Sequence, residues 1–272
     1  MLIDTHAHLN IMVKKKFDVP LTPSEIADAS NILKECAQEG VTQFINVGTS
    51  LIESQNCVEL AKKYDEIYAV VGIHPNDCTK EWLRDFKEIE KLVKDKESNR
   101  IVGIGECGLD RHYPDTDLPR QIDAFNAHIE LALEHNLPIV VHTRDALDET
   151  ALVLEKFKHE NLKGIIHCFS GDQAFAQFSV DLGFVLGIGG PLTYPKNSIL
   201  REIFATLPLE KIVLETDAPY LPIQEMRGKP NHPKYIKAIA QYLAELRDIS
   251  FNQVAKTTTQ TAQNLFNLEN FQ

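Results

Sequence analysis

The sequence lacks long apolar runs and an excess of positive charge, and each absence excludes a class of protein. No stretch approaches the roughly 18 consecutive apolar residues of a membrane-spanning helix. The first residues lack the basic, apolar and small-residue succession of a secretion signal. A formal net charge of −11 argues against holding duplex nucleic acid on a broad basic surface. We therefore expect a soluble, cytoplasmic protein with no membrane partner and no evident obligate protein partner. The sequence does not indicate its oligomeric state.

Cysteine is also scarce, and no two cysteines form a Cys-x-x-Cys pair. An odd number of unpaired cysteines fits free thiols in a reducing compartment better than a disulfide framework or a thiolate zinc site. The segment Gly187-Ile188-Gly189-Gly190 lacks the spacing and the acidic partner of a dinucleotide-binding fingerprint. We interpret the five cysteines as packing residues: Cys36, Cys57, Cys78, Cys107 and Cys168.

What the chain does contain is a regular alternation of short apolar runs with segments of helical period. Such runs, rich in β-branched residues, predict buried strands. The first strand includes Leu2–His8, and the others are Thr42–Val47, Ile67–Ile73, Ile101–Glu106, Pro138–His142, Lys163–His167, Phe184–Ile188 and Lys211–Asp217.

Two helix starts are marked by capping residues. The stretch Thr22-Pro23-Ser24-Glu25 predicts a capping box, and Ser250 with Gln253 predicts another that opens a final helix running to about Phe266. No Pro/Gly/Ser-rich linker divides the chain. The α/β pattern of eight strand–helix units therefore predicts a single-domain TIM (β/α)8 barrel over residues 1–272, with an extra C-terminal helix packed over its body. A doubly wound open sheet is the main alternative.

Histidines and carboxylates collect at the ends of the predicted strands, where barrels of this kind place their chemistry. Burying such groups together is costly unless a cation compensates them. A metal centre with nitrogen and oxygen ligands accounts for them, and two ions bridged by a carboxylate would use six ligands. The candidates at the strand ends are His6, His8, His74, Glu106, Asp110, His142, Arg144, His167 and Asp217.

The ordered set of motifs resembles the TatD-related deoxyribonucleases, a branch of the metal-dependent amidohydrolase superfamily. The similarity covers nearly the whole chain. It rests on Asp4-Thr5-His6-Ala7-His8, on the run from Gly103 to Asp110, on the run from Leu214 to Leu221, and on Arg227-Gly228-Lys229-Pro230-Asn231.

The resemblance implies two divalent cations, which could be zinc, magnesium or manganese. By this resemblance one ion would be held by His6, His8 and Asp217 and the other by His142 and His167, with Glu106 bridging the two. Many relatives in the wider superfamily have a carboxylated lysine after the fourth strand. The glutamate here favours the TatD-like branch over phosphotriesterase-like or dihydroorotase-like enzymes.

The sequence departs from the family pattern in two places. Thr261-Ala262 stands where the family usually has Asn-Ala, in the predicted terminal helix. The first loop is longer than expected and contains Lys14-Lys15-Lys16. This lysine run is interpreted either as a solvated surface or as a basic lip beside an anionic substrate.

The function implied is a nuclease that cleaves DNA phosphodiester bonds, in single strands or at ends, with water activated by two metal ions. Asp217 would orient the water and accept its proton. Hydrolysis of another ester or amide, such as the aminoacyl ester of a mischarged tRNA, is the first alternative, because paired ions also polarise carbonyl groups. A catalytically silent binding protein is the second.

The residues proposed for substrate contact have structural alternatives. His74 is a candidate for the phosphate or the leaving oxygen, or it fixes the loop that follows through Pro75. Arg144 is a phosphate candidate, or it forms an ion pair with Asp145 or Asp148.

Two polar residues follow the fourth predicted strand. His112 is expected either to face the pocket and bind substrate or to lie in a solvated loop. Asp110 is expected to support a metal ligand by a hydrogen bond.

Overall fold

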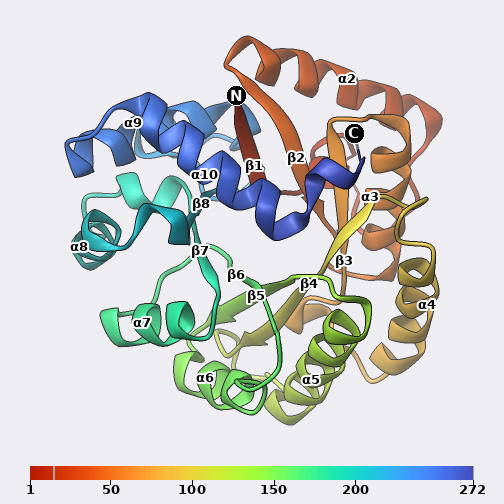
Figure 1. Ribbon diagram of the computed structural model, residues 1–272. Coiled ribbons are helices and arrows are strands. Elements are labelled where there is room, and N and C mark those ends of the chain that lie inside the picture. Colours follow the sequence, from red (N-terminus) through yellow and green to blue (C-terminus); the bar gives the residue numbers. More distant parts are fainter. Residues whose placement is uncertain (15, 272) are drawn as a thin grey trace.

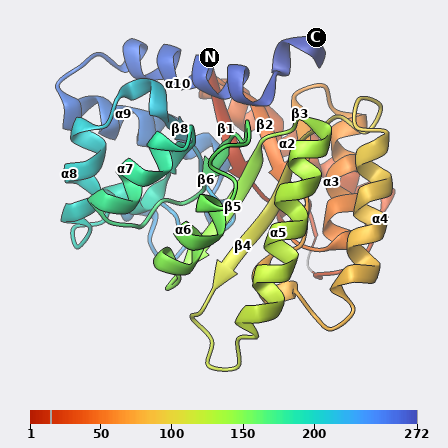
Figure 2. The ribbon, with the colours of Figure 1, turned by 60° about the horizontal axis from the view of Figure 1, so that its bottom comes forward.

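The computed structural model describes residues 1–14 and 16–271 as a ring of parallel strands surrounded by helices (Figures 1 and 2). The strands pair in chain order from β1 to β8, which confirms the predicted barrel over the open sheet. The strands are β1 (Leu2–Ala7), β2 (Val41–Val47), β3 (Ile67–Val71), β4 (Ile101–Asp110), β5 (Ile139–Arg144), β6 (Gly164–Ile166), β7 (Val185–Ile188) and β8 (Ile212–Leu214).

Helices follow the strands on the outside of the barrel, where their apolar faces pack against it (Figure 2). None of the described helices is both long and apolar enough to cross a bilayer. The α-helices are α1 (Leu9–Met12), α2 (Pro23–Gln38), α3 (Leu51–Lys63), α4 (Trp82–Lys94), α5 (Leu118–His135), α6 (Leu147–Glu155), α7 (Gln173–Asp181), α8 (Ser198–Thr206), α9 (Ile236–Arg247) and α10 (Phe251–Phe266).

The predicted capping residues begin two of these helices. The Thr22 hydroxyl accepts a hydrogen bond from the Glu25 N–H, and the Glu25 carboxylate accepts one from the Thr22 N–H, which completes the capping box of α2. The Ser250 hydroxyl likewise accepts from the Gln253 N–H at 3.1 Å at the start of α10. Helix α10 ends at Phe266, as predicted.

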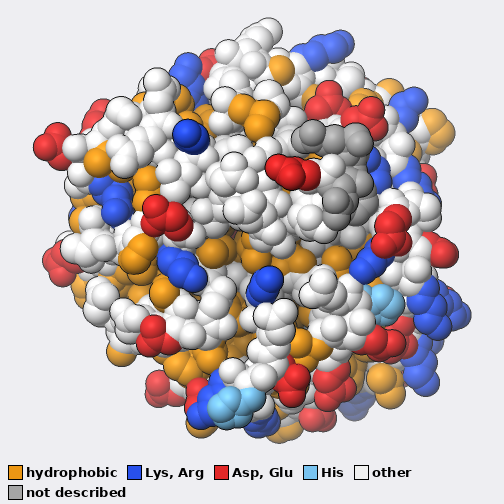
Figure 3. Space-filling view, in the orientation of Figure 1, with side chains coloured by type: hydrophobic (Ala, Val, Ile, Leu, Met, Phe, Trp, Pro, Cys, Tyr) orange, Lys and Arg blue, Asp and Glu red, His pale blue; other side chains and the backbone are white. Residues whose placement is uncertain are grey.

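The C-terminal helix closes one end of the barrel. Alternate strand residues point inward and form an interior cluster of small and branched side chains. Ala262, Phe266 and Leu268 join this cluster from α10 and the turn after it. Figure 1 shows α10 lying across the strands, and Figure 3 shows side chains of both charges interspersed on that face. The polar residues that follow the strands lie at the other end of the barrel.

Strands β1 and β8 are joined mainly by side chains and irregular backbone. The Asp4 carboxylate, which is fully buried, accepts hydrogen bonds from the Thr216 hydroxyl at 2.6 Å and from the Thr216 N–H at 3.0 Å. The Asp217 N–H donates to the His6 carbonyl, and the His8 N–H donates to the Ala218 carbonyl, each at 2.8 Å. Burial raises the pKa of Asp4 well above its usual range, although these donors oppose the shift. We call these contacts between β1 and the residues that follow β8 the β1–β8 seam. They fix the backbone on both sides of the site.

The structure of the first loop shows that Lys14 is neither a solvated lysine nor part of a basic lip beside the substrate. Its side chain is buried, with the ammonium 2.7 Å from each oxygen of the Glu53 carboxylate on α3 and 3.0 Å from the Val19 carbonyl. The same carboxylate accepts hydrogen bonds from the Asn10 side chain and the Asp18 N–H. Lys14 is therefore a structural anchor, neither solvated nor substrate-facing. Lys16 is exposed, and Lys15 lies outside the described residues.

Candidate metal centre

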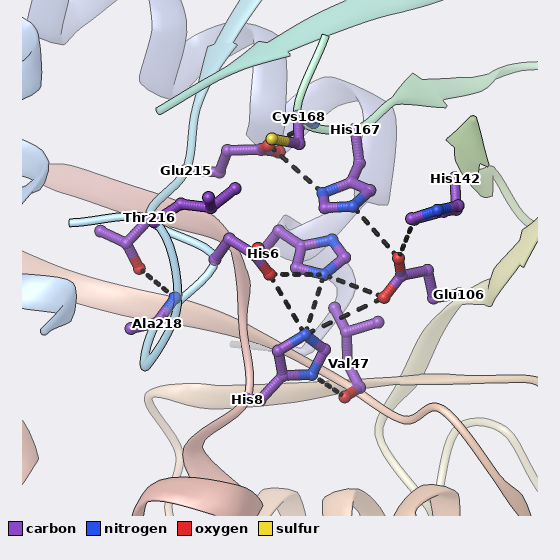
Figure 4. A network of polar contacts seen from close by, with 12 residues as sticks. His6, His8, Val47, Glu106, His142, His167, Cys168, Glu215, Thr216 and Ala218 are labelled. Carbon is purple, nitrogen blue, oxygen red and sulfur yellow. Dashed lines mark hydrogen bonds and ion pairs between the residues drawn. The ribbon is translucent and has the colours of Figure 1, made fainter. Parts of the chain in front are cut away.

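Glu106 lies at the centre of the polar cluster at the open end of the barrel (Figure 4). One carboxylate oxygen, Oε1, is 2.9 Å from His142 Nδ1 and 3.1 Å from His167 Nε2. The other, Oε2, is 3.4 Å from His6 Nε2 and 3.9 Å from His8 Nε2. Each oxygen thus faces a different pair of histidines, which is the arrangement that a bridging carboxylate requires.

Asp217 completes the group around the first strand. Its Oδ1 atom is 3.3 Å from His8 Nε2 and 3.7 Å from His6 Nε2, and these two nitrogens are 3.4 Å apart. His6 and His8 share a face because side chains on a strand alternate. Two ligands about 2.1 Å from a tetrahedral ion would lie about 3.4 Å apart. The spacing of these three residues therefore fits a shared cation.

The charges of the cluster also fit bound cations. No lysine or arginine forms an ion pair with Glu106 or Asp217 within residues 1–14 and 16–271; their partners in the described contacts are histidines. The rings of His6 and His167 stack with centroids 3.8 Å apart, so protonating both would place like charges together. Burial is the largest single effect on the pKa of Glu106 and would raise it. The neighbouring His167 and His74 lead the opposing effects, which together hold the pKa well below its usual range. A buried, ionised carboxylate ringed by imidazoles suits divalent metal ions.

Hydrogen bonds behind the rings select which nitrogen faces the centre. His8 Nδ1 is 2.8 Å from the Val47 carbonyl, so it carries the proton and leaves Nε2 free as a ligand. His142 Nε2 is 3.1 Å from Asp110 Oδ2, which leaves Nδ1 facing Glu106. Asp110 thus makes the contact that its expected supporting role requires.

Glu215 is a site residue that the sequence analysis missed. It is buried, with Oε1 3.3 Å from His167 Nδ1 and in a hydrogen bond with the Cys168 N–H. Its Oε2 atom and His6 Nδ1 have no hydrogen-bond partner in the described part of the chain. A side chain at Gly187 would place its Cβ 2.2 Å from Glu215 Oε2, so glycine makes room for the carboxylate. The sequence contained a signal for this residue, because Glu215 is two positions before Asp217 at the end of the same predicted strand.

The comparisons with known proteins decide the family. A family model described as TatD related DNase matches residues 3–267. The chain belongs to the TatD family. It is similar to the uncharacterized metal-dependent hydrolase YabD of Bacillus subtilis, at 34% identity over 98% of this chain and 100% of that protein. The crystal structure of the TatD homologue YjjV from Escherichia coli superposes with a TM-score of 0.88 at 30% identity, over 98% of both chains. We conclude that the chain is a metal-dependent hydrolase of the TatD family.

One relative has a more specific name. The 3'-5' ssDNA/RNA exonuclease TatD of Pantoea ananatis is 33% identical to this chain over 92% of its length and 98% of the relative's. The names of similar proteins therefore include both an uncharacterized metal-dependent hydrolase and an exonuclease.

His74 stands beside the TatD-family metal centre and also shapes its own loop. Its Nδ1 atom accepts a hydrogen bond from the Asn76 N–H at 3.1 Å, so the neutral ring carries its proton on Nε2. That Nε2 atom is 3.5 Å from Glu106 Oε1. Burial lowers the pKa of His74 to about 3. The two interpretations of His74, as a site residue and as a loop anchor, are therefore compatible.

Arg144 and His112 lie in different surroundings. No ion pair joins Arg144 to Asp145 or Asp148 among the described residues; Asp145 instead lies 3.3 Å from His112 Nδ1. His112 has 46% of its side chain exposed and is not part of the cavity wall described next. Arg144 does line that cavity.

A cavity of about 910 Å³ opens from the metal centre toward the ends of β5 to β8. His142, His167 and Asp217 form its inner wall. Its outer wall contains Arg144, Leu147, Cys168, Ser170, Asp172, Tyr194, Lys196, Ile199, Tyr220 and Leu221. The space available to a substrate is therefore on one side of the barrel mouth.

Proposed function

We propose that this TatD-family hydrolase cleaves phosphodiester bonds of DNA, in single strands or at strand ends. The position of Glu106 carries the proposal, because its two oxygens face two separate pairs of imidazoles. Paired metal sites of this kind are used for in-line displacement at phosphorus. The exonuclease name of the Pantoea relative supports a single-stranded substrate. Entry through a local cavity is compatible with a net charge of −11.

The residues divide between two divalent cations. His6, His8 and Asp217 would hold one, His142 and His167 the other, and Glu106 both. Bound there, the cations would lower the pKa of a water molecule toward neutrality and stabilise negative charge on the phosphoryl oxygens.

Asp217 would receive the proton of the attacking water. Its side chain is 15% exposed and lines the cavity, so it faces both the metal centre and the substrate space. Burial is the largest effect on the pKa of this carboxyl and would raise it, but the contacts with His8 and the nearby His167 together outweigh burial and lower the pKa. The carboxylate is therefore ionised near neutral pH and able to accept a proton.

His74 and Arg144 would contact phosphate groups of the substrate. Because the pKa of His74 is lowered to about 3, its ring stays neutral, and Nε2 offers a hydrogen bond to a phosphoryl or leaving oxygen without transferring its proton. Arg144 presents a guanidinium group, whose planar donors match phosphate oxygens.

The test is cleavage of labelled single-stranded DNA by purified protein. We expect cleavage with added divalent metal, and its loss with a chelator or in Asp217→Asn. Cleavage that survives both treatments would overturn the two-metal mechanism. A folded protein that binds metal but cuts no DNA would overturn the nuclease proposal, and a panel of ester and amide substrates would then identify the bond it hydrolyses.

A further inference from the structure

We propose that Arg144 and Lys196 form a second phosphate subsite, which binds the phosphate next to the one being cleaved. The inference rests on the proposed function and specifies its substrate as a nucleotide unit with a phosphate on each side. Both cations line the cavity that opens from His142, His167 and Asp217.

Arg144 is positioned relative to the metal centre by its strand. It follows His142 by two residues on β5, so both side chains lie on the same face, about 6.6 Å apart along the strand. That separation is similar to the distance between successive phosphates on a nucleic-acid strand. A substrate with its scissile phosphate at the metal centre therefore brings a neighbouring phosphate within reach of Arg144.

Two acids that follow Arg144 in the chain have other contacts. Asp145 lies 3.3 Å from His112 Nδ1, and Glu149 forms an ion pair with Arg111. Arg144 itself forms no ion pair in residues 1–14 and 16–271. Arg144 is an exposed residue that lines the cavity. An unpaired arginine beside a metal centre is suited to bind an anion.

Lys196 faces the same cavity from the segment between β7 and α8. The backbone there is held by side chains: the Arg201 guanidinium donates hydrogen bonds to the Tyr194 carbonyl at 2.6 Å and the Pro195 carbonyl at 2.8 Å. The Asn197 side chain donates to the Pro191 carbonyl at 2.9 Å. The lysine therefore projects from an ordered backbone, and no carboxylate among the described residues pairs with it.

The outer cavity is positive although the chain as a whole is negative. Among the described residues, the carboxylate on its outer wall is that of Asp172, whose Oδ1 caps α7 by accepting a hydrogen bond from the Phe175 N–H at 2.8 Å. The apolar wall includes Ile199, which is 60% exposed, and Tyr220, which is 42% exposed. The Tyr220 ring lies 5.8 Å from the His8 ring, next to the metal centre. An exposed aromatic ring in the same cavity as two anion sites fits a nucleoside bound beside its phosphates.

The test compares substrates that differ by one phosphate. The p-nitrophenyl ester of thymidine 5'-phosphate is assayed with and without a 3'-phosphate, and the p-nitrophenyl ester of thymidine 3'-phosphate with and without a 5'-phosphate. In one of the two series the added phosphate should lower KM at least about tenfold, the effect of one charge-assisted hydrogen bond. Arg144→Gln and Lys196→Gln should each reduce that advantage, whereas Lys256→Gln, on α10 at the other end of the barrel, should leave it unchanged.

A binding measurement separates this inference from the proposed function. Calorimetry with metal-loaded protein should show thymidine 3',5'-bisphosphate binding at least about tenfold more tightly than either monophosphate, and Arg144→Gln should remove the difference. Equal binding by all three compounds would overturn the subsite. If the bisphosphate binds more tightly but no diester is cleaved, the subsite stands and the nuclease proposal fails.

Discussion

The carboxylate of Asp4 accepts a hydrogen bond of 2.6 Å from the hydroxyl of Thr216, 212 positions later in the chain. The same carboxylate accepts a hydrogen bond from the His6 N–H at 3.2 Å. Thr216 is flanked by Glu215 and Asp217. A contact between two residues outside the candidate ligand set therefore helps to position candidate ligands that are far apart in the chain.

We predict that Thr216→Val weakens both the fold and the metal centre. The substitution removes a donor to a buried carboxylate, which should lower the free energy of unfolding by about 1–3 kcal/mol. Urea unfolding measures this loss, and metal titration measures the accompanying loss of affinity. Thr206→Val, at the end of α8, is the matched control. Equal losses of stability and metal affinity in the two variants would show that the β1–β8 seam has no special role.

Glu106→Gln is expected to disrupt both ion sites at once. Hydrogen-bond partners behind metal ligands are worth up to about 100-fold in metal affinity or activity, so losing a shared ligand should exceed this. Elemental analysis of the purified variant should find fewer than two divalent ions per chain. Glu155→Gln, an exposed change on α6, should keep the normal metal content. Two tightly held ions in Glu106→Gln would contradict the bridging role.

Asp110→Asn tests the orientation of His142. The amide can present its NH₂ group to His142 Nε2, which favours the tautomer with the proton on Nδ1, where Glu106 and the metal site lie. We expect a loss of about 10–100-fold in metal affinity or activity. Asp145→Asn provides the control, because Asp145 contacts only the exposed His112 in the described ion pairs. A normal metal titration curve for Asp110→Asn would disprove the orienting role.

His128 should make the fold sensitive to acid. Its Nε2 accepts a hydrogen bond from the Ile73 N–H at 3.0 Å and its Nδ1 donates to the Ala124 carbonyl, so the buried ring is held neutral. Burial lowers the pKa of His128 from 6.5 to about 4, although the bond to Ala124 opposes the shift. The stabilisation is complete above pH 6.5 and is lost as the pH falls toward 4, because the unfolded chain then binds a proton that the folded chain excludes.

The measurement for His128 is the free energy of unfolding between pH 7 and 4. His128→Gln should reduce its dependence on pH by up to about 1.4 kcal/mol per pH unit in this window. His159→Gln, an exposed change, should leave the dependence as it is in the unchanged protein. An unaltered slope in His128→Gln would mean that His128 binds its proton equally in the folded and unfolded chains.

The strand–helix alternation predicted the barrel because apolar periodicity reports which faces are buried. The predicted ends of the strands were less accurate. β8 ends at Leu214, and the chain then turns to deliver Asp217, which has a φ of +58°. β4 continues to Asp110 because its last residues pair with β5. Such limits are set by neighbouring strands, so they cannot be read from one segment alone.

The sequence could predict that the six candidate ligands lie together, because each histidine or carboxylate follows an apolar run. Other parts of the site depend on contacts between distant segments. Lys14 was misjudged because its partner Glu53 lies on a different element, 39 positions away. The contribution of Lys196 to the cavity depends on how the loop before α8 folds over the barrel mouth.

The wide spacing of the ligands has a consequence for protein synthesis. His6 leaves the ribosome more than two hundred residues before Asp217 and before Thr216, the partner of Asp4. At 5–20 residues per second this interval lasts roughly 10–40 s. The growing polypeptide therefore cannot bring all six candidate ligands together until Asp217 has been translated.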